Sequence, residues 1–171
     1  MKEWLQRKFI PKPAFLLVVI LLSIAFILQG GLSVLKIGIH YATGSGESMK
    51  KTLSDDSNLL LMKSDFKKIK RGDLVSIKSY NNGDRNYLLK RIIALPNETI
   101  KIQGNKIYIN EELLNEPYAY YSEPSKDDFN FTVPSDGYFV MGDNRMDSFD
   151  SRILGAISKT SINSVVLKFR K

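Results

Sequence analysis

The sequence contains no cysteine among its 171 residues and only one histidine, His40. Without cysteine, the chain can form no disulfide, no thiolate metal site and no cysteine nucleophile. With a single histidine it cannot build a multi-histidine metal cluster, and any serine-protease triad would have to use His40. We therefore expect no bound metal and no other cofactor.

The remaining composition is ordinary for a folded protein, with 43% hydrophobic and 25% charged residues, so disorder is not the leading interpretation. The length allows one sizeable domain. A formal net charge of +7 would suit a nucleic-acid partner. However, the basic residues are scattered and form neither a basic helix nor an aromatic-basic platform. We expect no nucleic-acid partner and favour a membrane-facing surface.

A long uncharged segment lies near the N-terminus, because no charged residue occurs between Lys12 and Lys36. Its core, residues 14–28, is apolar on every side, and with the weaker run that follows it reaches the ~20 residues that a membrane-spanning helix needs. A cleaved secretory signal would have a shorter core and a small-x-small site, which Leu28-Gln29-Gly30 matches poorly. A buried core helix would show a polar stripe. We predict a transmembrane anchor over residues 13–35.

Basic residues flank this anchor unequally. Those before it are Lys2, Arg7, Lys8 and Lys12, and those after it are Lys36, Lys50 and Lys51. The positive-inside rule then places the short N-terminus, residues 1–12, in the cytoplasm and residues 36–171 outside. We expect a single-pass protein with an extracytoplasmic domain.

Beyond the anchor, the alternation of apolar and polar residues is typical of strands. Hairpin turns are indicated at residues 81–84 and 104–105, where Asn and Gly tolerate positive φ. Strands are predicted over residues 74–80, 85–94, 99–103, 106–110, 137–141 and 164–169. We expect an exposed loop over residues 115–130, within a smaller hairpin-and-loop insertion at about 97–136. The sequence therefore predicts an all-β domain.

The first candidate for chemistry is a serine in a glycine-rich turn, Ser48 within residues 44–53. Such a turn can leave backbone N–H groups free around the hydroxyl, which is the geometry of an oxyanion hole. Taken alone this signal is weak, because stretches rich in Gly and Ser are usually plain loops.

The second candidate is Lys90, in the predicted strand 85–94. In a strand Lys90 shares one face with Leu88 and Ile92. A lysine must lose its proton to act as a base, and burial lowers its pKa from ~10.4 toward neutrality. The alternative is an edge lysine whose ammonium group reaches water.

The third candidate is a polar loop, residues 142–152, dense in Asp, Asn, Ser and Arg. This composition predicts a tightly hydrogen-bonded loop with internal ion pairs. A calcium-binding loop is the obvious rival. It fails because Arg145 occupies a ligand position, the central glycine is missing and no terminal Glu follows at the required spacing.

These segments, in this order, resemble the bacterial type I signal peptidases. Ser48-Met49 followed by Thr52-Leu53 looks like the nucleophile box, residues 71–75 resemble the second box, and residues 89–96 resemble the lysine box. Residues 142–152 are similar to the last box, and with the anchor the resemblance covers nearly the whole chain. A lysine at position 90 separates this bacterial type from relatives that use histidine there.

The resemblance implies a mainly β fold, with a coiled β-sheet catalytic domain behind one transmembrane helix in a bacterial cell membrane. It implies a serine endopeptidase that removes signal peptides from secreted preproteins after small-x-small sites, with signal peptides and membrane lipids as partners. Ser48 would be the nucleophile, its backbone N–H an oxyanion donor, Lys90 the general base and Ser148 the residue that orients the lysine. The residues expected to support the site are Asp143, Arg145, Asp150 and Arg152. Those expected to contact an extended substrate, near 43–48 and 86–90, are Gly46, Glu47, Met49 and Leu88.

Other interpretations start from Lys51, which stands where the family pattern usually has proline. This lysine creates an S-x-x-K sequence over residues 48–51, a motif of the penicillin-recognising enzymes. Those enzymes also need S-D-N and K-T-G, which do not occur here. Self-cleaving repressors share the Ser–Lys pair but begin with a DNA-binding domain. The remaining alternative is a non-catalytic signal-peptidase-like protein that assists assembly of secreted surface subunits, for example of a pilus.

Overall fold

The computed structural model describes residues 12–81 and 84–170. Contacts divide the chain into two compact units, Met1–Gly38 and Ile39–Lys171. The cytoplasmic segment expected over residues 1–12 lies, apart from Lys12, outside the described residues. The tip of the predicted hairpin turn, at residues 82–83, also lies outside them.

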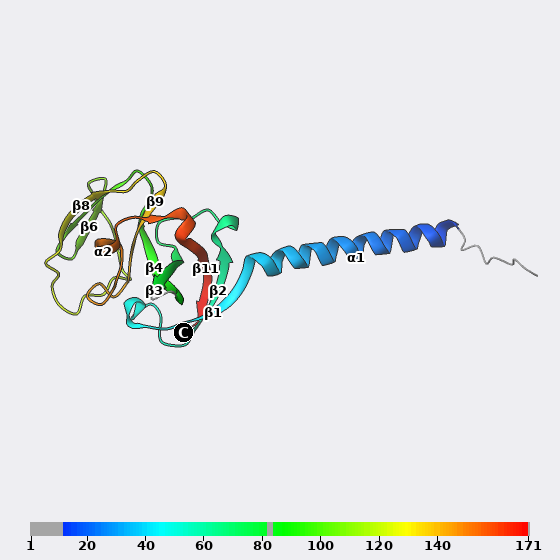
Figure 1. The fold of residues 1–171 in the computed structure, drawn as a ribbon, viewed down its shortest axis with the longest axis horizontal. Coiled ribbons are helices and arrows are strands. Elements are labelled where there is room, and N and C mark those ends of the chain that lie inside the picture. Colours follow the sequence, from blue (N-terminus) through cyan, green and yellow to red (C-terminus); the bar gives the residue numbers. More distant parts are fainter. Residues whose placement is uncertain (1–11, 82–83, 171) are drawn as a thin grey trace, which may run out of the picture. The chain divides into compact units, whose positions relative to one another are not determined.

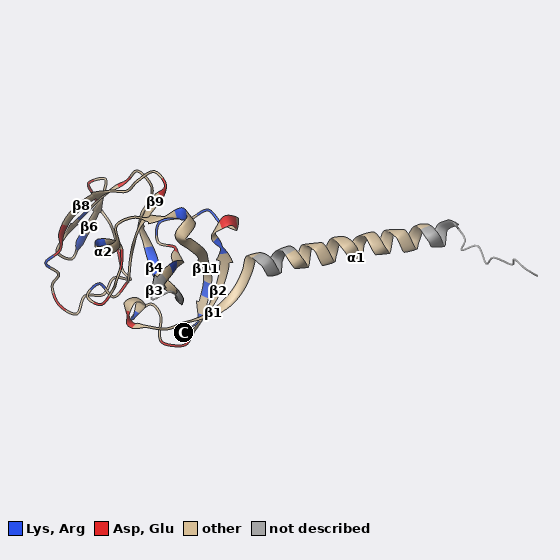
Figure 2. Cartoon of the chain, in the orientation of Figure 1, with Lys and Arg blue, Asp and Glu red and all other residues tan. Residues whose placement is uncertain are grey.

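The first unit contains a single long helix, α1 (Lys12–Gly38). At 1.5 Å per residue its 27 residues extend about 40 Å, more than the ~30 Å hydrocarbon core of a bilayer. The window Leu16–Ser33 has a mean hydropathy of 2.4, and none of it is buried within the protein. This window contains no Lys, Arg, Asp or Glu, and Figure 2 shows the middle of α1 without a charged residue. By length and composition, the helix could cross a membrane.

The second unit is built from two antiparallel sheets (Figure 1). Among the described residues, the larger sheet has the strand order β1-β2-β11-β3-β4-β9-β10 and the smaller has the order β7-β6-β5-β8. The strands of the larger sheet are β1 (Ile39–Gly44), β2 (Ser57–Lys63), β3 (Leu74–Asn81), β4 (Asp84–Ala94), β9 (Gly137–Met141), β10 (Ile157–Ser158) and β11 (Ile162–Arg170). Those of the smaller sheet are β5 (Thr99–Gln103), β6 (Lys106–Ile109), β7 (Glu112–Leu113) and β8 (Asp128–Thr132). Short helical turns connect them: η1 (Glu47–Met49), η2 (Ser64–Phe66), α2 (Ser151–Leu154) and η3 (Lys159–Ser161).

The prediction of a mainly β protein with one apolar N-terminal helix is confirmed. Each predicted strand is present within two residues of its predicted bounds. The prediction of an exposed loop over residues 115–130 is wrong in two places. Residues 128–130 belong to β8, whose Phe129 packs against the core. The side chain of Glu116 is only 6% exposed, because it pairs with a buried arginine.

The small sheet packs one face against the larger sheet. In β5 and β6, Ile100 pairs with Ile109 and Ile102 with Ile107, and the period of two places all four on the buried face. They form one core cluster with Phe139 and Met141 of β9. Because β9 leads directly into residues 142–152, this core positions the polar loop.

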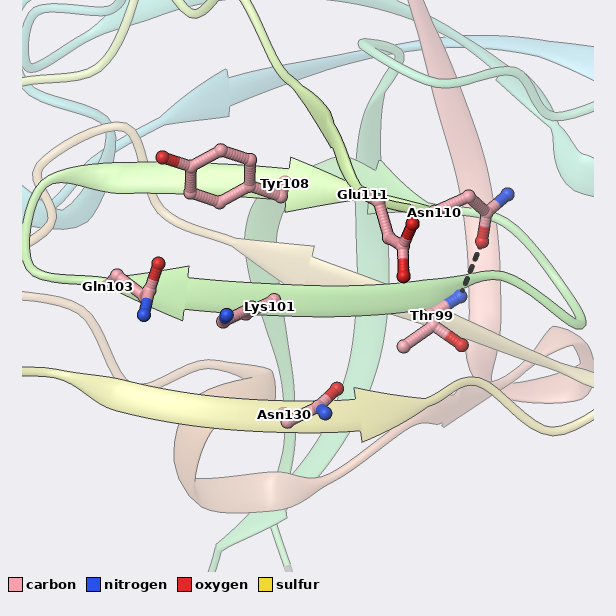
Figure 3. A pocket seen from close by; sticks show the side chains of 7 residues that line it. All are labelled: Thr99, Lys101, Gln103, Tyr108, Asn110, Glu111 and Asn130. Carbon is pink, nitrogen blue, oxygen red and sulfur yellow. Dashed lines mark hydrogen bonds between the residues drawn. The ribbon is translucent and has the colours of Figure 1, made fainter.

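The other face of the small sheet is polar. Figure 3 shows the side chains of Thr99, Lys101, Gln103, Tyr108, Asn110, Glu111 and Asn130, which line a hollow of about 690 Å³. The side chain of Asn110 accepts a hydrogen bond from the Thr99 N–H at 2.9 Å across the mouth of the β5–β6 hairpin. Neither Ser48 nor Lys90 lines this hollow.

The packing between the sheets predicts the effect of one substitution. Phe139 is 0% exposed, so Phe139→Ala should lower the free energy of unfolding by about 3–5 kcal/mol. Phe66, which is 55% exposed, provides the control, and Phe66→Ala should change stability by less than ~0.5 kcal/mol. Urea unfolding followed by circular dichroism measures both. Equal effects of the two variants would contradict this packing.

Candidate active site

Ser48 lies in a sharp turn that follows β1. The chain leaves Gly44, passes Gly46 at φ 103°, and forms the single 3₁₀ turn η1 with Ser48 at its centre. The Gly46 N–H donates to the Asp55 carboxylate at 3.1 Å, which holds the start of the turn. The first N–H groups of such a turn have no partner within it. The turn can therefore present both a hydroxyl and backbone donors.

Lys90 lies in β4 and reaches Ser48. Its side chain is 3% exposed, and its Nζ lies 2.7 Å from Ser48 Oγ, within hydrogen-bonding distance. On β3 its directly paired neighbour is Val75, which is fully buried. Burial lowers the pKa of Lys90, although the negative charges of Asp150 and Asp147 oppose the change. The lowered pKa favours the neutral amine, the form that can accept a proton.

The polar loop after β9 holds the backbone of the Ser48 turn. The Asn144 N–H donates to the Ser48 carbonyl at 3.0 Å, and the Asn144 side chain donates to the Glu47 carbonyl at 3.1 Å. Gly142 packs so closely that a Cβ there would lie 2.6 Å from both the Ser48 carbonyl oxygen and Ser148 Cβ. The loop and the turn are thus fixed to each other without room for a side chain at position 142.

The Asp143 side chain joins this loop to two other segments. Its fully buried carboxylate accepts from Arg91 Nε at 2.8 Å and from Arg91 Nη2 at 2.6 Å. It also accepts from the Thr52 hydroxyl, four residues after the serine. A third nitrogen, Arg91 Nη1, donates to the Gly72 carbonyl at 2.8 Å. The buried charge is stable because it is paired and fully hydrogen-bonded.

Asp150 and Arg152 form a second buried pair. The Asp150 carboxylate accepts from Arg152 Nε at 3.0 Å and from Arg152 Nη2 at 2.9 Å, and it also accepts from the Gly142 N–H at 3.1 Å. It caps α2 by accepting from the Arg152 N–H. Arg152 Nη1 extends the pair to Asp127 at 3.0 Å. These bonds close the polar loop on itself.

Arg145 forms the third pair, with Glu116 outside the loop. Its side chain is 0% exposed, and Nη2 and Nη1 donate to the two Glu116 oxygens at 2.6 and 3.0 Å. Its Nε donates to the Gly142 carbonyl at 3.0 Å. Arginines therefore pair with the buried carboxylates around the loop. Among the described residues, no three His, Asp or Glu side chains gather as a metal site.

The predicted site residues thus meet from three distant parts of the chain: the turn after β1, the middle of β4, and the loop after β9. Ser148 lies against Gly142 in this group. Its Oγ is the one buried side-chain oxygen or nitrogen among the described residues that has no hydrogen-bond partner. Its role in orienting Lys90 stays a prediction.

The residues predicted to contact substrate differ in their exposure to solvent. They lie near the Ser48–Lys90 pair, called the dyad below. Gly46 and Glu47 are exposed and Leu88 is half-buried. Met49 is 3% exposed and packs in a core cluster with Leu53, so its side chain lies beneath the turn. Their contacts with substrate stay predictions.

Most of the chain, including the polar loop, Ser48 and Lys90, matches one known protein family. A family model described as "Signal peptidase, peptidase S26" matches residues 13–168. The chain belongs to this family.

Two relatives named signal peptidase I are each 39% identical to the chain over the aligned residues. Signal peptidase I of Bacillus amyloliquefaciens is 39% identical over 132 residues, which is 68% of each chain. Signal peptidase I U of Bacillus subtilis (strain 168) is 39% identical over 121 residues, 63% of this chain and 62% of the relative. The crystal structure of a signal peptidase I from Enterococcus faecalis V583 is 36% identical and superposes with a TM-score of 0.50, covering 58% of this chain and 97% of that chain.

Several contacts within the site carry no signal in the sequence. Arg91 follows the lysine but points to the other face of β4, and its partner Asp143 is 52 residues away. Glu116 lies in a segment that the sequence predicts to be a loop. Asn144 lies in the polar loop, but the residues next to it in the sequence do not indicate a hydrogen bond to Ser48. Only tertiary contacts assign these partners.

Lys51 has a backbone conformation that differs from what the family pattern implies. It lies at φ 85°, in the left-handed region that non-glycine residues rarely adopt. The proline that usually occupies this position is fixed near φ −65° and cannot take up this backbone. The turn after Ser48 is therefore built differently from one that contains the proline.

This turn predicts opposite effects for two substitutions at position 51. Lys51→Pro should lower the free energy of unfolding by about 1–3 kcal/mol because the backbone must rearrange. Lys51→Gly should be neutral or stabilising, because glycine adopts positive φ without steric cost. Lys51→Ala, which removes the side chain but keeps the steric cost, serves as the control. Thermal unfolding measures all three, and a proline variant more stable than the glycine variant would refute the left-handed turn.

Proposed function

We propose that this member of the signal peptidase family is a membrane-bound type I signal peptidase, which removes signal peptides from secreted preproteins after small-x-small sites. Ser48 is the nucleophile and Lys90 is the general base. The observation that carries the proposal is the 2.7 Å separation between Lys90 Nζ and Ser48 Oγ, with the amine buried. Family membership supports the class of reaction.

The geometry supports serine-protease chemistry in which a lysine takes the place of histidine. Neutral Lys90 accepts the Ser48 hydroxyl proton as Oγ attacks the carbonyl carbon of the scissile bond. The Ser48 N–H stabilises the oxyanion that forms. Lys90 then gives the proton to the leaving amine, the acyl-enzyme remains, and a water molecule deprotonated by Lys90 hydrolyses it.

Two strand edges near Ser48 and Lys90 have no described strand paired to them, which suits the binding of an extended substrate. β4 pairs with β9 only from Arg91 onward, so on that side residues 86–90 face no described strand. Among the described strands, β1 is the end strand of its sheet and pairs with β2 alone. A signal peptide can add its main chain to such edges. In this proposal Gly46, Glu47 and Leu88 lie along its path, and Met49, whose side chain is buried, contributes only its backbone.

The helix α1 supports anchoring in the cell membrane, because its window Leu16–Ser33 is long and apolar enough to cross it. In the proposed topology the N-terminus is cytoplasmic and the strands lie outside, where secreted preproteins emerge. Lipids of that membrane would surround the helix.

Substitution of the dyad tests the reaction. The solubilised full-length protein should cleave a precursor with an Ala-x-Ala site, while Ser48→Ala and Lys90→Ala should lose at least ~10⁴-fold in kcat/KM. Leu113→Ala, at an exposed position away from the dyad, is the control and should keep full activity. Cleavage retained by either dyad variant would refute the assignment. No cleavage by any form would favour the non-catalytic alternative that assists surface assembly.

The pH dependence tests the base. A protonated lysine cannot accept the serine proton, so kcat/KM should rise with pH through one ionisation below the usual ~10.4 of lysine. Asp147 raises the pKa of Lys90, so Asp147→Asn should move the midpoint to lower pH. Asp128→Asn, on the exposed strand β8, is the control and should leave it unchanged. A midpoint that stays fixed in Asp147→Asn would contradict the effect of that charge on Lys90, and a kcat/KM that falls as the pH rises through the ionisation would contradict a lysine base.

A further inference from the structure

Residues 116–121 lie directly against the polar loop, although they come from the insertion that carries the small sheet. The Tyr120 N–H donates to the Asp143 carbonyl at 2.7 Å, and the Arg145 N–H donates to the Tyr120 carbonyl at 2.9 Å. These bonds form a parallel bridge between Tyr120 and Asn144. The insertion thus supplies a short backbone support beneath the residue that binds the Ser48 carbonyl.

An ion pair fixes this support in place. Glu116 accepts two hydrogen bonds from Arg145, at 2.6 and 3.0 Å, and both side chains are almost fully buried. The Tyr121 hydroxyl lies 3.1 Å from Arg145 Nη1. A second contact joins the same segment to β4, because the Arg91 guanidinium lies 4.0 Å from the centroid of the Tyr118 ring. A buried bidentate pair of this kind has one preferred geometry.

A short chain of contacts connects Glu116 to the nucleophile. Arg145 binds Glu116 on one side and the Gly142 carbonyl on the other. Asn144, the residue before Arg145 in the chain, donates to the carbonyls of Ser48 and Glu47. A shift of Arg145 would therefore move the donors that set the orientation of the Ser48 turn.

We propose that Glu116 is a positioning residue: by holding Arg145 it fixes loop 142–145, and through Asn144 it fixes the angle at which Ser48 meets Lys90 and the substrate. The inference rests on the proposed function, since it assigns Glu116 to the same reaction. Glu116 does not touch substrate, because its side chain is 6% exposed. Its effect is on the geometry of the reacting atoms, and misplacement by about 1 Å can cost ~10²-fold in rate.

The test compares Glu116 with Glu98, a second carboxylate that is paired with an arginine. Glu98 also binds an arginine through two oxygens, Arg71 at 2.7 and 2.9 Å. Its side-chain hydrogen bonds and ion pair among the described residues involve Arg71 and Leu95, not loop 142–145. The unsubstituted protein and four variants are assayed with the Ala-x-Ala precursor. The variants are Glu116→Gln, Glu116→Asp, Tyr121→Phe and Glu98→Gln. The readouts are kcat, KM, the pH midpoint, thermal unfolding and hydrogen exchange.

Glu116→Gln should lower kcat by about 10–100-fold with little change in KM. The pH midpoint should not move, since Glu116 is not among the charges that shift the pKa of Lys90. Glu116→Asp should recover part of the loss because the charge returns. Tyr121→Phe, which removes one hydroxyl, should show a smaller loss and remains informative if Glu116→Gln fails to fold. Glu98→Gln should lower the unfolding temperature but keep kcat.

Several outcomes would overturn the proposal. These are an unchanged kcat in Glu116→Gln, a change in KM alone, or an equal loss of kcat in Glu98→Gln. Hydrogen exchange gives a readout independent of activity, with faster exchange expected at residues 47–50 and 142–148 in Glu116→Gln and not in Glu98→Gln. Unchanged exchange there would refute the proposal even if no form cleaved precursor. Cleavage retained by Ser48→Ala would instead refute the proposed function.

Discussion

The amine of Lys90 is buried in the larger sheet. Val75 is the paired residue on β3, and the Ser48 hydroxyl is the hydrogen-bond partner of the amine. A charged amine in this position would lose its hydration, so the fold favours the neutral form. Neutrality gives the amine the capacity to accept a proton. The same burial restricts its neighbours, because any other charge brought into the region must be paired or lie at the surface.

The three arginine–carboxylate pairs around residues 142–152 satisfy this restriction. Asp143 binds Arg91, Asp150 binds Arg152, and Glu116 binds Arg145. Buried pairs of this kind add little net stability compared with apolar packing, but breaking one leaves an uncompensated charge. Their effect is to give the loop one arrangement. That arrangement places Asn144 against the Ser48 carbonyl and Gly142 against Ser148.

The small sheet contributes to the site although it carries neither dyad residue. Its isoleucines pack on Phe139 and Met141 of β9, and the chain passes from β9 into the polar loop. Its long connection supplies Glu116 and the backbone of Tyr120. The insertion therefore supports the loop both from the core and from the side.

The sequence by itself determined the classes of structure and indicated most residues of the candidate site. Uninterrupted apolar character specified the N-terminal helix, and alternation specified strands such as β5 and β6, because these signals are local and periodic. Alternation also placed Lys90 among apolar neighbours, and motif order indicated the family. The predicted strands do not include β1, β2, β7, β8 or β10. The Leu59-Leu60-Leu61 run of β2 does not alternate, β8 follows a long polar segment, and β7 and β10 have only two residues each. Only the tertiary structure decided that Ser48 meets Lys90, that Arg91 binds Asp143 and that Glu116 is buried. Those contacts join residues 29–52 positions apart, and such pairings depend on how the sheets curl and pack, which no local pattern encodes.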